Sequence, residues 1–185
     1  MRESSMQHAQ PSLSNHQPSI DLLVDALAST DYSARRHALK ALIRRGTIAV
    51  DALIGLLKSS SEQVRWEAAK ALGRIGGPES ADALAALLDD ESPDVRWRAA
   101  DGLISIGGDA LIPVLRSLIA RPASPLSREA SSHVLRAFLN QEFADIVFPV
   151  HAALEVGLPV EEVVVAAHEA LNRLRDSRRR RFLTH

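Results

Sequence analysis

Two tryptophans, Trp66 and Trp97, occupy the same position in two nearly identical segments of the chain. The segments read VRWEAAKALGRIGG and VRWRAADGLISIGG, and they begin 31 residues apart. Arg36 and Arg128 hold the equivalent position in weaker copies on either side. Because Trp and Arg side chains dominate the binding energy of many protein interfaces, this row predicts molecular recognition.

The same spacing places further polar side chains beside this row on one helix face. We predict that a partner binds there, to Arg36, Trp66, Glu67, Lys70, Arg74, Trp97, Arg98, Asp101 and Arg128. The indoles would anchor the partner, and the arginines would select its acidic groups. A second interpretation is that each indole packs on its neighbour and on arginine stems without any ligand. A fifth copy of the segment extends the rows with Val165, Ala166, Glu169 and Arg173.

Three other polar residues of the repeated segments are predicted to be structural. Arg65 and Arg96 point sideways, where hydrogen bonds to a neighbouring unit would hold them. His133 aligns with Gly102 and Ala71 on the inner side of the helix, so we expect a packed core histidine.

The sequence gives little support for bond-making chemistry. It has no Ser-His-Asp order, no glycine-rich phosphate loop and no HExxH motif. It also has no cysteine, which excludes disulfides, thiolate metal ligands and cysteine nucleophiles. We therefore predict no catalytic, metal-binding or cofactor-binding residues and no cofactor, while leaving enzymatic activity open.

The elements that position these residues are helical hairpins. The tryptophan-bearing segment is predicted to be the second helix of each hairpin. In the copy with Trp66, the apolar residues follow the 3.6-residue period of a helix: Val64, Ala68, Ala71, Leu72 and Ile75. A leucine-rich partner segment precedes each copy by about eleven residues, and no stretch alternates with the period of a strand. The helix starts are predicted at Asp31, Ser61, Ser92 and Ser124, and the helix ends at Gly46, Gly76, Gly77, Gly107 and Gly108.

The repeats divide the chain into five units between two tails. The units span about residues 19–47, 48–78, 79–109, 110–140 and 141–176. Residues 1–18 are polar and are predicted to be a disordered tail, and residues 177–185 form a basic C-terminal tail. A single helix pair buries too little apolar surface alone, so the units must stack.

The pattern VRxxAAxALGxIG, carried by residues 64–77 and 95–108, resembles the HEAT-like repeat first associated with phycobilisome lyases. The resemblance implies an all-α fold, a right-handed, armadillo-like α-solenoid of about five HEAT-like helical hairpins. The second helices, with the predicted binding face, would line its concave side. Proteins of this repeat class include bilin lyases, di-iron deoxyhypusine hydroxylases and adaptors, so the fold constrains function weakly.

We therefore predict a non-enzymatic scaffold that binds another protein in the concave groove. A bilin-lyase-like chromophore site could use both indoles with Arg36 and Arg128. A site like that of HEAT-like DNA glycosylases could use Trp97 with Asp101. A deoxyhypusine-hydroxylase-like di-iron site would need several His-Glu pairs, and the chain has the one pair His168–Glu169. Neither the partner's identity nor an oligomeric state follows from the sequence.

Composition bounds these hypotheses further. The net charge of −1 provides no general attraction to nucleic acid or to a membrane. Hydrophobic residues make up 46% and aromatic residues 4% of the chain, which suits a stack rich in alanine and leucine. Residues 1–18 lack the apolar core of a signal peptide, and no apolar run reaches membrane-spanning length, so we expect a cytoplasmic location.

Overall fold

The computed structural model describes residues 18–183 of the chain, so the tail predicted for residues 1–18 lies almost wholly outside them. Within these residues the protein is all α-helical and contains no strand. Its helices, three of them short 3-10 helices (η), are α1 (Ile20–Leu27), α2 (Tyr32–Arg45), η1 (Gly46–Ala49), α3 (Val50–Leu56), α4 (Glu62–Ile75), α5 (Pro78–Ala86), η2 (Leu87–Asp89), α6 (Pro93–Ile106), η3 (Gly107–Ala110), α7 (Leu111–Ala120), α8 (Pro125–Arg136), α9 (Ala144–Val156) and α10 (Val160–Leu183).

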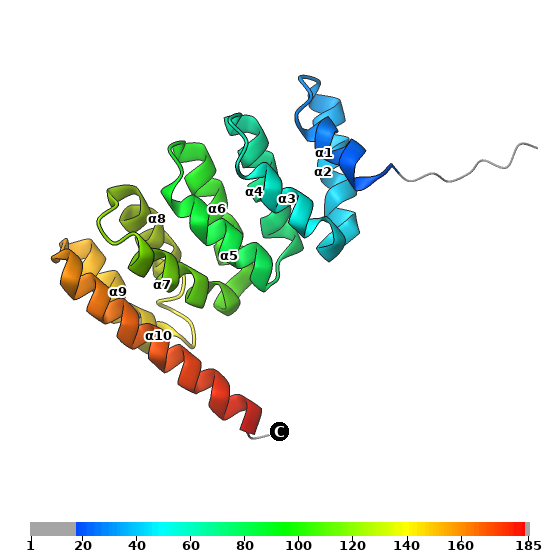
Figure 1. Cartoon of the computed structure of the whole chain (residues 1–185). Coiled ribbons are helices and arrows are strands. Elements are labelled where there is room, and N and C mark those ends of the chain that lie inside the picture. Colours follow the sequence, from blue (N-terminus) through cyan, green and yellow to red (C-terminus); the bar gives the residue numbers. More distant parts are fainter. Residues whose placement is uncertain (1–17, 184–185) are drawn as a thin grey trace, which may run out of the picture.

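The helices pair into hairpins that stack side by side (Figure 1). The second helices of the hairpins, α2, α4, α6 and α8, pack on one another in order and form one layer. The first helices, α1, α3, α5 and α7, form the other layer and pack less closely at each step. Closer packing is expected of the inner layer of a curved stack. The predicted all-α solenoid of helical hairpins is therefore confirmed.

Local capping explains most boundaries of α2, α4, α6 and α8. The side chains of Asp31, Ser92 and Ser124 accept hydrogen bonds from backbone N–H groups in the first turns of α2, α6 and α8, as predicted. Ser61 holds the equivalent position before α4, but its side chain makes no capping hydrogen bond. A positive φ is found at four of the predicted helix-ending glycines, but not at Gly108: Gly46, Gly76, Gly77 and Gly107.

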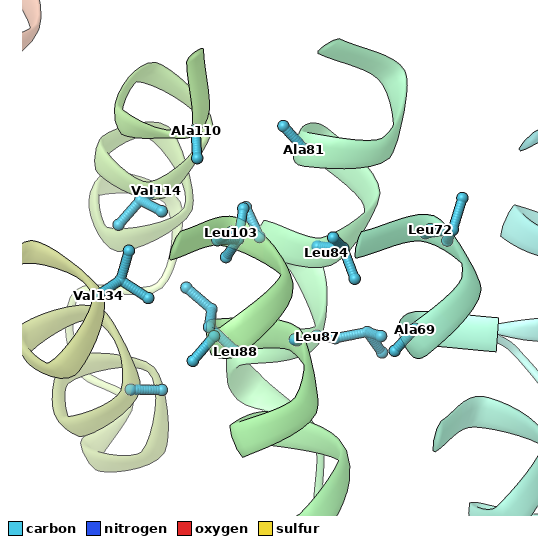
Figure 2. Close-up of a cluster of buried hydrophobic side chains, with 14 of the residues drawn as sticks. Ala69, Leu72, Ala81, Leu84, Leu87, Leu88, Leu103, Ala110, Val114 and Val134 are labelled. Carbon is cyan, nitrogen blue, oxygen red and sulfur yellow. The ribbon is translucent and has the colours of Figure 1, made fainter. Parts of the chain in front are cut away.

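The core is a continuous apolar seam between the two layers. Figure 2 shows Leu84 of α5 between Leu72 of α4 and Leu103 of α6, and all three side chains are fully buried. Further along, Val114 of α7 and Val134 of α8 continue the seam. Burial of each such side chain stabilises the fold by about 1.5–3 kcal/mol. Each unit thus covers the apolar face of the next.

Two glycines meet where α4 packs against α6. A Cβ atom added at Gly73 of α4 would lie 2.7 Å from the Cα atom of Gly102 on α6. A Cβ atom at Gly102 would lie 3.1 Å from the Cα atom of Gly73 and 3.0 Å from the Leu84 side chain. The two backbones therefore touch where neither helix has a side chain, and α4 and α6 become the most closely packed pair of the stack.

In the fifth hairpin the two helices exchange layers compared with the other four hairpins. α9, its first helix, packs on α8 in the second-helix layer, whereas α10 packs on α7 and α9. The repeat pattern in the sequence predicts that α10 continues the second-helix rows. That prediction is wrong for Val165, Ala166, Glu169 and Arg173, which lie on α10 in the other layer.

The linker before α9 accounts for this inversion. The chain leaves α2, α4 and α6 through a glycine with positive φ, which turns it towards the first-helix layer. Residues 137–143, between α8 and α9, contain no glycine and no residue with positive φ. They form turns that return the chain along α8, and Phe143 packs over Gly108 before α9 begins. α9 consequently lies beside α8.

A buried ion pair joins the second and third units. The Nε and Nη2 atoms of Arg65 donate to the two carboxylate oxygens of Asp90 at 2.8 and 2.9 Å, and both side chains are less than a tenth exposed. The hydrogen bond to Asp90 is the main cause that raises the pKa of Arg65 above its ordinary value. Arg65 also donates to the carbonyl of Ser59 at 3.0 Å. The predicted structural role of Arg65 between units is confirmed.

Arg96 has a different role from the one predicted. Its Nη1 atom donates to the carbonyls of Asp90 and Glu91 at 2.8 and 3.1 Å, within its own unit. Arg35 holds the carbonyls of Ser29 and Thr30 in the same way. These arginines tie the turn inside their own hairpin to its second helix. Arg65 binds the turn of its hairpin in the same way and also forms the ion pair with Asp90 of the next unit.

One long apolar stretch takes its predicted form, and the basic C-terminal stretch does not. By length and composition, Pro93–Ala120 could cross a membrane. This stretch is α6, η3 and α7, broken at Gly107 with φ +82°, and its Leu103 and Leu111 side chains are buried in the core. At the other end, α10 continues to Leu183, beyond the predicted boundary at residue 176.

Adding a methyl group at the glycine contact should separate α4 from α6. We expect Gly73→Ala to lower the free energy of unfolding by about 1–3 kcal/mol, because its Cβ atom would meet backbone that cannot move aside. The matched control is Gly55→Ala on α3, where a Cβ atom meets nothing within 4 Å. That control should stabilise the helix by about 0.5–1 kcal/mol. Urea unfolding of both variants measures the difference, and equal effects would contradict the contact.

Removing one partner of the buried ion pair should be costly. We expect Asp90→Ala to lower the free energy of unfolding by about 3 kcal/mol, because Arg65 would keep a buried, unpaired charge. The control is Asp82→Ala, which removes a pair with Arg116 at 3.9 Å whose side chains are more than half exposed. That change should alter stability by less than about 1 kcal/mol. Urea unfolding measures both variants. A similar loss of unfolding free energy in the two would show that the Arg65–Asp90 pair stabilises the fold no more than an exposed pair.

Candidate functional site

The inverted fifth hairpin closes one end of an open groove on the second-helix layer. The groove has a volume of about 640 Å³ and lies between α6, α8 and the C-terminal end of α9. Aromatic, basic and acidic side chains line it together with small apolar ones. Its lining residues are Trp97, Ala123, Pro125, Arg128, Glu129, Ser132, His133, Arg136, Leu154, Glu155 and Gly157. We call it the Trp97 groove.

Trp97 is the main apolar surface of this groove. Its side chain is 40% exposed, and its ring packs at a right angle on the His133 imidazole, with centroids 4.7 Å apart and planes at 86°. An edge-to-face contact of this kind fixes the indole while leaving much of its surface open to solvent. Trp97 therefore presents a rigid aromatic side chain to the groove.

His133 is not the core histidine that the sequence predicted. It is half-buried and lines the groove, because α9 leaves this side of α8 open next to Trp97. The Nη2 atom of Arg136 lies 3.0 Å from the Nδ1 atom of His133. A guanidinium can only donate, so Nδ1 accepts this bond and does not carry the proton. His133 thus orients both Trp97 and Arg136.

The other basic residue of the groove is tied to the backbone of the fifth hairpin. Arg128 donates from Nη2 to the carbonyl of Leu158 at 2.8 Å. Leu158 follows the end of α9, so this bond anchors the inverted helix on α8. The carboxylate of Glu129, in contrast, is exposed in the groove. Both guanidinium groups have protein partners, whereas the groove keeps an accessible carboxylate.

A hydroxyl, a carboxylate and an imidazole meet beside the groove, where α8 faces α9. Ser132 donates to Glu155 Oε1 at 2.6 Å, and His151 Nε2 lies 3.7 Å from the same oxygen. The hydrogen bond from Ser132 is the first cause that lowers the pKa of Glu155, followed by the charges of His151 and Arg136. The carboxylate stands between the hydroxyl and the imidazole. In this order the imidazole cannot take the serine proton, unlike in a serine hydrolase.

Trp66 has a different environment from its repeat-equivalent Trp97. The Nζ atom of Lys70 and the Cζ atom of Arg98 each lie 4.6 Å from the centroid of the Trp66 ring. Arg98 also pairs with Asp101 at 3.5 Å. The half-buried indole of Trp66 is thus occupied by cations of its own chain. This is close to the arrangement without a ligand that the sequence left open.

The sequence contains the signal for this difference. Lys70 and Arg98, the two cations on Trp66, correspond by the 31-residue repeat to Asp101 and Glu129. Neither carboxylate can make a cation–π contact with Trp97. The repeat places the two indoles in one row. The charges around them indicate that Trp66 is covered and that Trp97 is open.

Glu67 is not part of an open binding face. It is 5% exposed, at the junction of α2 and α4, where Gln63 Nε2 donates to its Oε1 atom at 3.2 Å. Arg35 Nε lies 3.9 Å from the same oxygen. The prediction of solvent exposure is wrong because Glu67 lies towards the preceding unit on the helix, where α2 covers it.

The remaining predicted residues fall into separate places. A hollow of about 50 Å³ lies beside the glycine contact and is lined by Lys70, Arg74, Arg98 and Asp101 among others. Arg36 is exposed on α2, two units from the Trp97 groove. Of the nine predicted binding residues, Trp97 and Arg128 share the groove. Sequence reasoning did not identify Leu154, Glu155 and Gly157 as lining residues, because it placed α10 there instead of α9.

The described residues contain no cluster of three or more His, Asp or Glu side chains that could hold a metal ion. His168 and Glu169 are both exposed on α10. No arrangement in this part of the chain therefore supplies the several ligands that a di-iron centre requires.

The comparisons with known proteins agree with the stacking. A family model described as HEAT repeats matches residues 20–92 and 50–136. These overlapping matches run from the start of α1 to the end of α8 and cover more than half of the chain. They stop before α9, where the stacking order changes. No curated protein matches the sequence.

The titration of Glu155 tests the link between α8 and α9. Because its pKa is lowered from the ordinary value of 4.5, the ionised carboxylate stabilises the fold at pH values above 4.5. This contribution is lost as the pH falls through the lowered pKa. We expect Ser132→Ala to move the titration midpoint of Glu155 up towards 4.5, because the hydroxyl donor is gone. NMR titration of the side-chain carboxyl carbon measures it. An unchanged midpoint would contradict the Ser132 contact.

Proposed function

Because the chain belongs to the HEAT-repeat family, we propose that it is a non-enzymatic scaffold that binds a segment of another protein in the Trp97 groove. The observation that carries this proposal is the exposed indole of Trp97, held edge-on by His133 at the side of an open groove. An aromatic side chain fixed in place loses little entropy on binding, which suits an interface anchor. Its repeat-equivalent Trp66 lacks this freedom, because two cations already occupy its ring.

The groove supports recognition of a protein segment better than recognition of a bilin or of DNA. A bilin-like chromophore site was predicted to use both indoles, but Trp66 lines a different pocket from Trp97. A DNA site would need a run of free cations, whereas Arg128 and Arg136 have protein partners and two glutamates share the groove. Mixed polar and aromatic linings are typical of protein interfaces.

The experiment compares two single variants of exposed apolar residues. We expect Trp97→Ala to weaken the affinity for a partner by about 2 kcal/mol or more, as expected for a central anchor. The control is Ile48→Ala, which removes a 74% exposed side chain on η1, outside the groove. Proteins captured from extracts by wild type and both variants identify partners, and calorimetry with each purified partner measures affinity.

Two results decide this proposal. Trp97→Ala should lose the partners that Ile48→Ala keeps, while its free energy of unfolding changes by less than about 1 kcal/mol. If Trp97→Ala retains the same partners with the same affinity, the Trp97 groove is not the binding site.

A further inference from the structure

The two repeated tryptophans differ in one respect that points to a ligand. Trp66 carries two basic side chains of its own chain at its ring, Lys70 from the same helix and Arg98 from the next helix. At the equivalent positions around Trp97 the sequence has Asp101 and Glu129. Among the described residues, the ring contact of Trp97 is His133 and no lysine or arginine stacks on it. The ring of Trp97 thus lacks the cation–π contacts that the chain itself provides to the ring of Trp66.

The charges near Trp97 favour a cation over an anion. Glu129 is exposed in the groove, and Glu155 adds a second carboxylate to its lining. The two arginines of the groove keep their charge, but each already donates a hydrogen bond within the chain, Arg128 to the Leu158 carbonyl and Arg136 to His133. The face of an indole also attracts cations through its quadrupole. The exposed carboxylate of Glu129 and the ring of Trp97 therefore both favour a cation.

We propose that the Trp97 groove recognises a basic side chain, an arginine or a lysine, presented by the partner segment. The basic group lies over the Trp97 indole as Arg98 lies over Trp66, and the carboxylate of Glu129 pairs with it. This inference rests on the proposed scaffold function and names the chemistry that the groove selects. It reverses the expectation from the sequence that the arginines of this face select acidic groups.

Short peptides test the inference without a known partner. Capped glycine-rich peptides carrying one arginine, one citrulline or one glutamate are titrated into the full chain, and NMR follows the indole N–H signals of both tryptophans. We expect the arginine peptide to shift the Trp97 signal, and the uncharged citrulline peptide to shift it much less. Trp66 is an internal control whose signal should stay in place, because its ring is already occupied.

A charge change inside the groove provides the matched variant. Glu129→Arg restores at Trp97 the cation that Arg98 provides at Trp66. The introduced guanidinium should occupy the indole and reduce the shift caused by the arginine peptide by about tenfold or more. The control Glu79→Arg reverses an exposed charge in the first turn of α5, outside the groove, and should leave the shift unchanged.

The outcomes separate this inference from the proposed function. If the glutamate peptide shifts Trp97 more than the arginine peptide does, or if neither moves it, the preference for a basic side chain is wrong. With a captured partner, Glu129→Arg should abolish binding. If Trp97→Ala abolishes partner binding but Glu129→Arg strengthens it, the scaffold function stands and the basic ligand is excluded. If Trp97→Ala has no effect, the scaffold proposal itself fails.

Discussion

The contact between Gly73 and Gly102 sets the spacing at the centre of the stack, and the surroundings of Trp66 depend on it. With no side chain between the two backbones, α4 and α6 pack more closely than any other pair of helices in the described structure. Arg98 lies one turn before Gly102 and can therefore reach across to the ring of Trp66. A wider spacing would move the guanidinium away from the indole. The covered state of Trp66 is thus a consequence of how two helices meet.

Repetition in the sequence fixes the backbone of each unit but not the environment of each side chain. Trp66 and Trp97 hold the same position on α4 and α6, and each indole contacts the helix that follows in the second-helix layer. On α6 the facing residue is Arg98, and on α8 its counterpart is Glu129 beside His133. Equivalent residues therefore acquire different neighbours. The ring of Trp66 contacts two cations of its own chain, whereas the ring of Trp97 remains exposed.

The features that could be predicted from the sequence are those that depend on local geometry. Helical periodicity, the caps at Asp31, Ser92 and Ser124, and the turns at Gly46 and Gly76 depend on a few consecutive residues. The features that could not be predicted depend on contacts between units. Examples are the burial of Glu67 under α2, the placement of His133 at an open edge, and the order of α9 and α10. The lack of a glycine between α8 and α9 is a signal in the sequence for the last of these.

The candidate site exists because the repeat changes at its C-terminal end. Had α10 continued the second-helix layer, a regular helix would lie beside α8 where the end of α9 now lies. The inversion instead brings the Leu158 carbonyl to Arg128 and Glu155 to Ser132, so polar groups of α8 are satisfied by the end of a hairpin. The groove keeps its width next to Trp97 because these bonds hold α9 by its C-terminal end. In a solenoid whose units satisfy one another, an open aromatic surface arises where the following helix provides no cation to the ring, and this is where we place recognition.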